Sequence, residues 1–231
     1  MTSPTVVFDL DGTLIDTAPD LVATLNVIFG REGLPPVAYA PARNMVGGGA
    51  RVMIERGLKA EGRLPAVEVD RLVRDFIAHY AEHIADRSRP FEGVEAALDA
   101  LAGNGCRLAI CTNKLEWLSV RLLAALGLSG RFAAICGADT FAVAKPDPEI
   151  LRATIARAGG IAAHAVMVGD SITDIATARA AGVPVLAVDF GYTEVPVAHL
   201  GPDRVVSAFR DLPGAVLDLM AARPSKFAGN R

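Results

Sequence analysis

Residues 5–13 read TVVFDLDGT, an unbroken apolar run that stops at two acids, a glycine and a threonine. Short apolar runs without alternation are typical of strands that are buried on both faces of a parallel sheet. Five later runs have the same character and, with Thr5–Leu10, predict the strands of one sheet: Arg107–Thr112, Phe132–Cys136, Ala165–Gly169, Pro184–Val188 and Arg204–Val206.

Helical segments separate most of these runs. Alternation of strands and helices predicts an α/β fold with a doubly wound, mostly parallel sheet. The helical segments are Gly93–Ala102, Glu116–Ala125, Pro148–Ala158 and Thr173–Ala181.

The interval from Leu10 to Arg107 is too long for the single helix that usually joins two parallel strands. Within it, Thr17–Arg31 and Val69–Tyr80 carry apolar residues at helical spacing. We therefore predict a helical insert at residues 16–85, an α/β core made of residues 1–15 and 86–222, and a loose tail at residues 223–231.

The composition narrows the class of protein. Of the 231 residues, 52% are hydrophobic and 21% are charged, which is typical of a globular chain. A net charge of −3 gives no basic field that would indicate nucleic acid, and no apolar run is long enough for a membrane helix. The start of the sequence lacks the features of a signal peptide. The three cysteines have no paired spacing, so we expect a reducing cytoplasm, whereas the oligomeric state is left open.

Polar side chains gather where the predicted strands end. Ligands of open α/β sheets bind at the carboxyl ends of the strands, so we expect these side chains to share one edge. They are Asp9 and Asp11 after the first strand, Thr112 and Asn113 after the second, Lys145 in the loop before a helix, and Asp170 and Asp174 after the fourth strand.

Asp9 and Asp11 stand two apart on an extended segment, so their carboxylates point the same way. Two like charges this close are costly unless a cation or a proton lies between them. Mg²⁺ prefers oxygen ligands and is the natural cation, with Asp170 completing the set. Asp11-Gly12 alone also fits a hairpin turn, but no partner strand follows. The segment from residue 171 to Asp174 also fits a capping box, which leaves Asp170 unexplained.

Thr112 and Asn113 fit two interpretations. They could cap the helix that follows, or their hydroxyl, amide and backbone N–H groups could bind phosphate at the helix N-terminus. Pro146 and Pro148 fix the backbone around Lys145, which favours a positioned cation over an ordinary surface charge. The chain has no Walker A loop. Together these residues indicate phosphoryl chemistry with a carboxylate nucleophile.

The sequence resembles the haloacid dehalogenase superfamily of phosphohydrolases over nearly its whole length. Four motifs stand in the order of that family: DLDGT at 9–13, TN at 112–113, KP at 145–146 and GDSITD at 169–174. Within the superfamily the sequence is most similar to the phosphoglycolate phosphatases, as indicated by TNK at 112–114, KPDP at 145–148, and Arg43 followed by VGGG at 46–49. Leu115 departs from the pattern, which has proline there. The resemblance implies a Rossmann-like core with the helical insert as a cap.

The resemblance also implies hydrolysis of a phosphomonoester, 2-phosphoglycolate, through an aspartyl-phosphate. Asp9 would attack phosphorus, and Asp11 would protonate the leaving alkoxide and then activate water. Thr112, Asn113 and Lys145 would hold the phosphoryl oxygens, with Lys145 offsetting the growing charge.

The resemblance also implies a binding site for Mg²⁺. The Asp9 carboxylate, the Asp11 backbone carbonyl and Asp170 would bind the ion. Asp174 would orient that shell of ligands.

The predicted cap is rich in bases. Between residues 43 and 63 the sequence has five basic and two acidic residues, a local net charge of +3. The bases are Arg43, Arg51, Arg56, Lys59 and Arg63, and the acids are Glu55 and Glu61. Such a run is either a solvated helix face or a positive pocket that steers a small anionic, phosphorylated substrate. Phosphoglycolate carries a phosphate and a carboxylate, which an arginine would suit. Arg43 and Arg51 flank the glycines and are the candidates.

Two alternatives stay open. Other phosphatases and phosphomutases of the superfamily, which act on sugar phosphates, nucleotides or pyrophosphate, share the four core motifs. A phosphoaspartate signalling receiver also uses strand-end aspartates, a lysine and Mg²⁺, but it carries an adjacent acidic pair on its first strand. Turnover separates the two, because a receiver holds its phosphate whereas an enzyme releases it many times.

Overall fold

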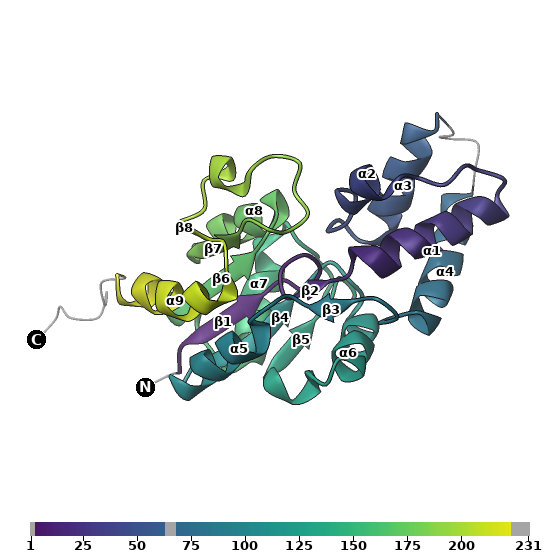
Figure 1. Ribbon diagram of the computed structural model, residues 1–231. Helices are drawn as coiled ribbons and strands as arrows, with labels where there is room; N and C mark the ends of the chain where they lie inside the picture. The colour runs from purple at the N-terminus through teal and green to yellow at the C-terminus, as the bar shows by residue number, and fades with distance from the viewer. Residues whose placement is uncertain (1–2, 63–67, 223–231) are drawn as a thin grey trace, which may run out of the picture.

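The computed structural model describes residues 3–62 and 68–222, which form a six-stranded sheet in the order β5-β4-β1-β6-β7-β8. Every neighbouring pair in this sheet is parallel. The predicted α/β fold with a doubly wound parallel sheet is confirmed (Figure 1). The strands are β1 (Thr5–Phe8), β4 (Arg107–Cys111), β5 (Ala134–Cys136), β6 (Ala165–Gly169), β7 (Val185–Val188) and β8 (Arg204–Val206).

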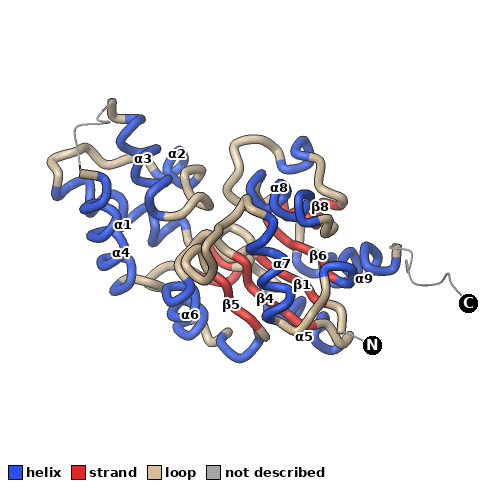
Figure 2. Tube along the Cα trace, turned by 180° about the vertical axis from the view of Figure 1, so that it is seen from behind, coloured by secondary structure: helices blue, strands red, loops and turns tan. Residues whose placement is uncertain are grey.

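Helices cover both faces of the sheet (Figure 2). Val6 and Phe8 of the central strand β1 belong to the core on one face and Val7 to the core on the other, and all three are fully buried. Burial on both faces explains why β1 is apolar without alternation. The first face packs against α5 (Val94–Gly103), α6 (Glu116–Ala125) and α9 (Leu212–Ala221), and the second against α7 (Pro148–Arg157) and α8 (Ile172–Ala181).

Among the described residues, helices α1 to α4 stand apart from the sheet, beyond the carboxyl end of β1 (Figure 1). Helix α4 packs against α1 and α3, and α2 packs against α1. Leu25, Phe29, Ile54, Leu58 and Phe76 are buried among them, and this apolar interior is continuous with the core on one face of the sheet. The predicted helical cap is therefore present, as α1 (Ala18–Arg31), α2 (Tyr39–Arg43), α3 (Ala50–Ala60) and α4 (Val69–Glu82).

A short ribbon joins the cap to the core. β2 (Ile15–Asp16) and β3 (Arg89–Pro90) pair antiparallel, so the chain leaves the core and returns to it side by side. Next to the ribbon, the buried Asp20 carboxylate accepts hydrogen bonds from the Ser88 backbone N–H at 2.7 Å and from the Ser88 hydroxyl at 2.6 Å. The division into residues 1–15, 16–85 and 86–222 stays a prediction, which the position of this ribbon supports.

The observed elements differ from the expected ones mainly at their ends. β1 ends at Phe8 and β4 at Cys111, so Leu10 and Thr112 lie in the loops that follow the strands. No helix among the described residues is both long and apolar enough to span a bilayer. Arg63 and the tail at residues 223–231 lie outside the described residues.

Candidate active site

Three buried carboxylates meet at the carboxyl edge of the sheet. Asp9 follows β1, Asp170 follows β6, and Asp174 lies in the first turn of α8. One oxygen atom from each lies within 4.8 Å of the others. They converge because β1 and β6 are adjacent parallel strands in the register Phe8↔Val168, so the two chains leave the sheet at the same edge.

Lys145 bridges two of these carboxylates. Its Nζ atom lies 2.9 Å from Asp9 Oδ1 and 2.6 Å from Asp174 Oδ1, and all three side chains are buried. The other Asp174 oxygen, Oδ2, accepts hydrogen bonds from the Ser171 hydroxyl at 2.6 Å and the Ser171 backbone N–H at 3.1 Å. The predicted capping box is present, and it fixes the carboxylate that holds Lys145.

The pKa values show that one lysine does not balance three acids. Burial raises the pKa of Asp9 to about 8, with Lys145 opposing this shift and Asp174 and Asp170 adding to it. Burial, together with the Asp174 carboxylate, raises the pKa of Asp170 to about 7. Burial alone would lower the pKa of Lys145, but Asp174 and Asp9 raise it above its usual value. When all three acids are ionised, three carboxylates and one ammonium carry a net charge of two minus, and their oxygen atoms suit a hard divalent cation.

The turn after β1 brings the backbone close to Asp170. Gly12 has φ +82°, and a Cβ atom there would lie 2.6 Å from Asp170 Oδ2. The Thr13 hydroxyl donates to Asp170 Oδ1 at 2.8 Å, and the Tyr192 backbone N–H donates to Asp170 Oδ2 at 2.7 Å. Glycine is needed here because a side chain would displace the carboxylate. Thr13 and Tyr192 are site residues that sequence reasoning missed, although Thr13 lies within the first motif.

Thr112 and Asn113 lie at the end of β4, the other neighbour of β1 in the sheet. Thr112 is buried, and its Oγ1 accepts the Lys114 backbone N–H at 3.2 Å. Asn113 Nδ2 donates to the Lys145 carbonyl at 3.2 Å, whereas Asn113 Oδ1 is buried without a partner. The structure therefore brings both residues to the edge that holds Asp9 and Lys145, and their phosphate-binding role stays a prediction.

The Asp11 carboxylate does not belong to the cluster of three acids and pairs with Lys114 instead. Its Oδ2 lies 2.9 Å from Lys114 Nζ, and both side chains are buried. Lys114 Nζ also lies 4.6 Å from the centre of the Tyr80 ring, which comes from cap helix α4. Burial would lower the pKa of Lys114, but Asp11 and Tyr80 together raise it, so the ammonium stays charged. A metal role for Asp11 therefore rests on its backbone carbonyl and stays a prediction.

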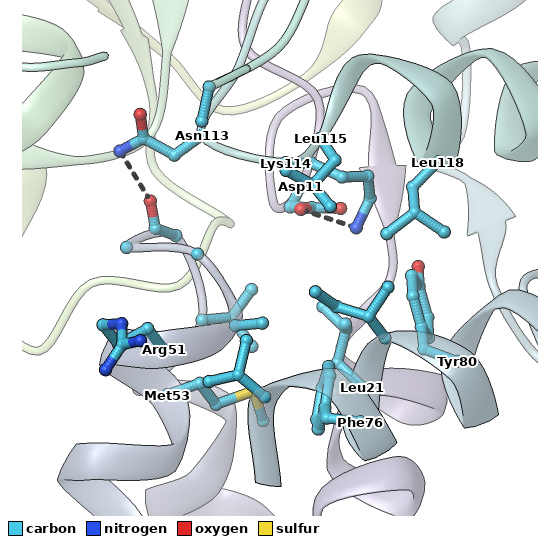
Figure 3. A pocket seen from close by; sticks show the side chains of 18 residues that line it. Asp11, Leu21, Arg51, Met53, Phe76, Tyr80, Asn113, Lys114, Leu115 and Leu118 are labelled. Carbon is cyan, nitrogen blue, oxygen red and sulfur yellow. Dashed lines mark hydrogen bonds and ion pairs between the residues drawn. The ribbon is translucent and has the colours of Figure 1, made fainter. Parts of the chain in front are cut away.

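A cavity of about 260 Å³ opens between the cap and this part of the core (Figure 3). Asp11, Asn113 and Lys114 line it from the core, whereas α1, α3 and α4 contribute mainly apolar side chains. Gly49 allows the cap to approach closely, because a Cβ atom there would lie 3.2 Å from the Asn113 carbonyl oxygen. The sequence pointed to Lys114 through the TNK string but assigned it no role, and no sequence signal marked Tyr80.

The cap arginines do not face the cavity as a clamp. The Arg43 guanidinium donates to the Phe190 carbonyl at 2.8 Å and lies 4.7 Å from the centre of the Tyr192 ring. Arg51 lines the cavity, but it is about half exposed and forms an ion pair with Asp70. Arg56 and Lys59 are exposed and do not line it. A substrate-binding role for Arg43 and Arg51 stays a prediction, and Lys114 is the buried cation among the described residues that line the cavity.

Comparison with known proteins agrees with this geometry. The family model described as haloacid dehalogenase-like hydrolase matches residues 6–188. A phosphoglycolate phosphatase of Caulobacter vibrioides is 49% identical over 226 residues, which cover 97% of this chain and 95% of the relative. One of Mesorhizobium japonicum is 53% identical over 210 residues, 90% and 92% of the two chains. The crystal structure of a predicted phosphoglycolate phosphatase from Haemophilus somnus is similar with a TM-score of 0.86 at 29% identity, covering 93% of this chain and 98% of that one.

Proposed function

Because this chain belongs to the haloacid dehalogenase-like hydrolases, we propose that it is a Mg²⁺-dependent phosphatase that converts 2-phosphoglycolate to glycolate and phosphate. The relatives identify it as a phosphoric monoester hydrolase. The observation that carries the proposal is Asp9, a buried carboxylate held by Lys145 at the edge where Thr112 and Asn113 also lie.

The proposed reaction has two steps. An oxygen of the Asp9 carboxylate attacks phosphorus, the bond from phosphorus to the ester oxygen breaks, and Asp11 gives its proton to the leaving oxygen. Water then attacks the aspartyl-phosphate, Asp11 takes the proton from that water, and the Asp9 carboxylate is restored as phosphate leaves. Asp11 is available for this because its Oδ1 is buried without a partner, while its Oδ2 is held by Lys114.

Three groups of this chain hold the phosphoryl oxygens in this proposal. Lys145 supplies a positive charge beside Asp9, and Thr112 and Asn113 supply hydrogen bonds from the neighbouring strand end. Their value lies in being fixed before the substrate arrives: Lys145 by Asp174, and Asn113 by the Lys145 carbonyl.

The metal site proposed for Mg²⁺ is formed by Asp9, Asp170 and the Asp11 backbone carbonyl, with Asp174 as the residue that orients it. A bound Mg²⁺ supplies charge stabilisation for the phosphoryl oxygens. Thr13 and Tyr192 position Asp170, because each donates a hydrogen bond to one of its two oxygens. Asp174 serves by holding Lys145, since both of its oxygens already accept hydrogen bonds from the chain.

Two observations support the proposed substrate: the relatives are phosphoglycolate phosphatases, and the cation Lys114 lines the cavity. Other phosphomonoesters and pyrophosphate are the alternatives within the family, and a receiver domain is the alternative outside it. Free cysteines, all buried, support the reducing cytoplasm that we expect for the protein.

Phosphate release with Mg²⁺ tests the proposal. The panel is 2-phosphoglycolate, hexose phosphates, nucleotides and pyrophosphate, and the expected result is a kcat/KM at least about a hundredfold higher for 2-phosphoglycolate. Asp9→Asn is the control and should lose activity by about a thousandfold or more while staying folded. If the protein is phosphorylated stoichiometrically and does not turn over, the proposal that it is an enzyme is contradicted. If it prefers a different ester, only the proposed substrate is contradicted.

A further inference from the structure

Unpartnered polar atoms cluster around the cavity between the cap and the core. Among the described residues, five buried side-chain oxygen atoms have no hydrogen-bond partner. Three of the five belong to residues that line this cavity: Asp11 Oδ1, Tyr80 Oη and Asn113 Oδ1. A buried polar group without a partner is costly, so such a group is expected where a ligand supplies the missing bond.

Asp11 and Asn113 already act in the proposed reaction and Lys114 holds Asp11, whereas no role has yet been given to Tyr80 or to the side of Lys114 that faces the cavity. Tyr80 is 1% exposed, and burial raises the pKa of its hydroxyl to about 12, so it is a neutral hydrogen-bond donor. Lys114 lies against the ring of Tyr80 and beside Asp11, and is 7% exposed. In Figure 3 both side chains reach into the same part of the cavity, Tyr80 from the cap and Lys114 from the core.

Apart from Asp11, the other side chains labelled in this part of the cavity are apolar, among them Leu21 and Leu118. A few convergent polar groups in an apolar pocket are typical of a site that fixes the orientation of a small ligand. One cation and one hydroxyl donor match the two oxygens of a carboxylate.

We infer that Lys114 and Tyr80 form the subsite that binds a carboxylate on the leaving group of the substrate. The inference rests on the proposed function and deepens it, because it names the part of the chain that distinguishes a phosphorylated short acid from other phosphomonoesters. The ester oxygen of the substrate must reach Asp11, which is the proton donor in the proposed reaction. In 2-phosphoglycolate one carbon separates the ester oxygen from the carboxylate. Because Lys114 Nζ lies 2.9 Å from the Asp11 side chain, an ester oxygen at Asp11 places the substrate carboxylate next to Lys114.

The subsite spans both parts of the molecule. Lys114 belongs to the loop that follows β4 of the core, and Tyr80 belongs to α4 of the cap. A carboxylate bound by both therefore holds the cap against the core while the reaction proceeds. An ester without a carboxylate makes no bond to Lys114 or to the Tyr80 hydroxyl. Its binding therefore leaves these buried polar groups without a ligand, which costs free energy.

Two substrates separate carboxylate binding from a general role in the site. Ethyl phosphate has the two-carbon length of 2-phosphoglycolate with a methyl group in place of the carboxylate. Because Lys114 also holds Asp11, we expect Lys114→Met to lower kcat/KM on both substrates, but at least about tenfold more on 2-phosphoglycolate than on ethyl phosphate. For Tyr80→Phe, which keeps the ring against Lys114, we expect a fall of about tenfold on 2-phosphoglycolate alone.

Matched controls come from exposed residues of the cap. Lys59→Met removes the same charge, and Tyr39→Phe removes the same hydroxyl, at exposed positions that do not line the cavity. Both should match the wild type on both substrates. Lys114→Arg, which keeps the charge, should retain more activity on 2-phosphoglycolate than Lys114→Met does. Thermal unfolding of each variant shows whether it is folded. If Lys114→Met does not fold, the comparison of the two substrates with Tyr80→Phe still tests the subsite.

The outcomes separate this inference from the proposed substrate. An equal fall on both substrates in Lys114→Met and Tyr80→Phe would overturn the subsite, because Lys114 would then act only on Asp11. A wild-type enzyme that prefers another carboxylated ester, such as 2-phospholactate, with the same selective loss in Lys114→Met, would support the subsite and contradict the proposed substrate. A wild-type enzyme that treats ethyl phosphate and carboxylated esters alike would overturn both.

Discussion

Asp9 and Asp170 are buried, and burial keeps their carboxyl groups protonated well above the pH at which an exposed aspartate ionises. Their pKa values are raised from 3.8 to about 8 and about 7. Between about pH 4 and pH 8 these two groups therefore bind more protons in the folded, metal-free protein than in the unfolded chain. Their contribution to the free energy of unfolding then falls as the pH rises through this window.

This linkage gives a prediction for the metal-free protein. With a chelator present, we expect Tm to fall by about 3 °C or more between pH 5.5 and pH 8.5, the shift that about 1 kcal/mol produces in a chain of this size. Asp170→Asn removes one of the two groups and should show a shallower fall. Calorimetry of both proteins measures this, and identical pH dependence in the two would show that these carboxylates are not the cause.

The same two groups predict how Mg²⁺ binding depends on pH. The ion needs ionised carboxylates, so binding displaces protons and the affinity should rise between pH 6 and pH 8.5. Isothermal titration calorimetry in buffers of different ionisation enthalpy measures the protons released. Asp170→Asn should weaken Mg²⁺ binding by about a hundredfold or more. An affinity that is independent of pH would contradict the raised pKa values.

At the scale of elements, the turn after β1 holds Asp170 in place through a close backbone approach at Gly12. Gly12→Ala should lower kcat/KM by about a hundredfold, because the added Cβ would meet Asp170 Oδ2 at 2.6 Å and the Tyr192 ring at 2.8 Å. Gly33→Ala is the matched control, since Gly33 also has a positive φ, +67°, but no atom within 4 Å of an added Cβ. Both should lose about 1–2 kcal/mol of stability from the backbone conformation. Equal activity in the two variants would show that the close approach does not matter.

The elements also show where the sequence was informative. β6 and β8 have the predicted bounds, because both are framed by polar or glycine residues where the apolar run ends. The ribbon of β2 and β3 could not be predicted, since two residues per strand carry no periodicity. The acids of the site could be placed on one edge because adjacent parallel strands end together.

Contacts that depend on the orientation of the cap could not be predicted. Tyr80 is one apolar position of an amphipathic helix, and only the packed structure shows that it reaches Lys114. Arg43 was expected at the substrate because it precedes the glycines of the cap, whereas its guanidinium is bound by Phe190 and Tyr192 of the core. Tyr192 lies in the loop after β7 and belongs to none of the four motifs.

At the scale of the whole molecule, Tyr192 connects the metal site to the cap. Its backbone N–H donates to Asp170, its hydroxyl donates to Asp16 Oδ1 at 2.5 Å and accepts the Ala18 backbone N–H at 3.0 Å, and its ring lies under Arg43. Asp16 and Ala18 lie where the chain enters the cap. Tyr192 thus contacts both Asp170 and the segment through which the chain enters the cap.

Tyr192→Phe should loosen this connection. The variant loses the two hydroxyl hydrogen bonds but keeps the ring and the backbone N–H, so we expect a loss of about 1–3 kcal/mol of stability. Faster hydrogen exchange should appear at the Ala18 amide, and KM for 2-phosphoglycolate should rise. Denaturant unfolding, amide exchange and steady-state kinetics measure the three effects, with Tyr39→Phe as the control. Unchanged exchange at Ala18 would contradict the role of the hydroxyl.

The strand order has a consequence for how the chain folds as it is synthesised. β1 is made first, yet its partners are β4, from Arg107, and β6, from Ala165, so both of its edges wait for sequence that follows the entire cap. At about 5–20 residues per second, the first partner leaves the ribosome roughly 5–20 s after β1. The cap helices, whose contacts are local, can form during this interval, whereas Val6, Val7 and Phe8 stay without a sheet. Among the strands of the described sheet, β1 thus waits longest for its first partner, with three apolar side chains that the finished sheet buries.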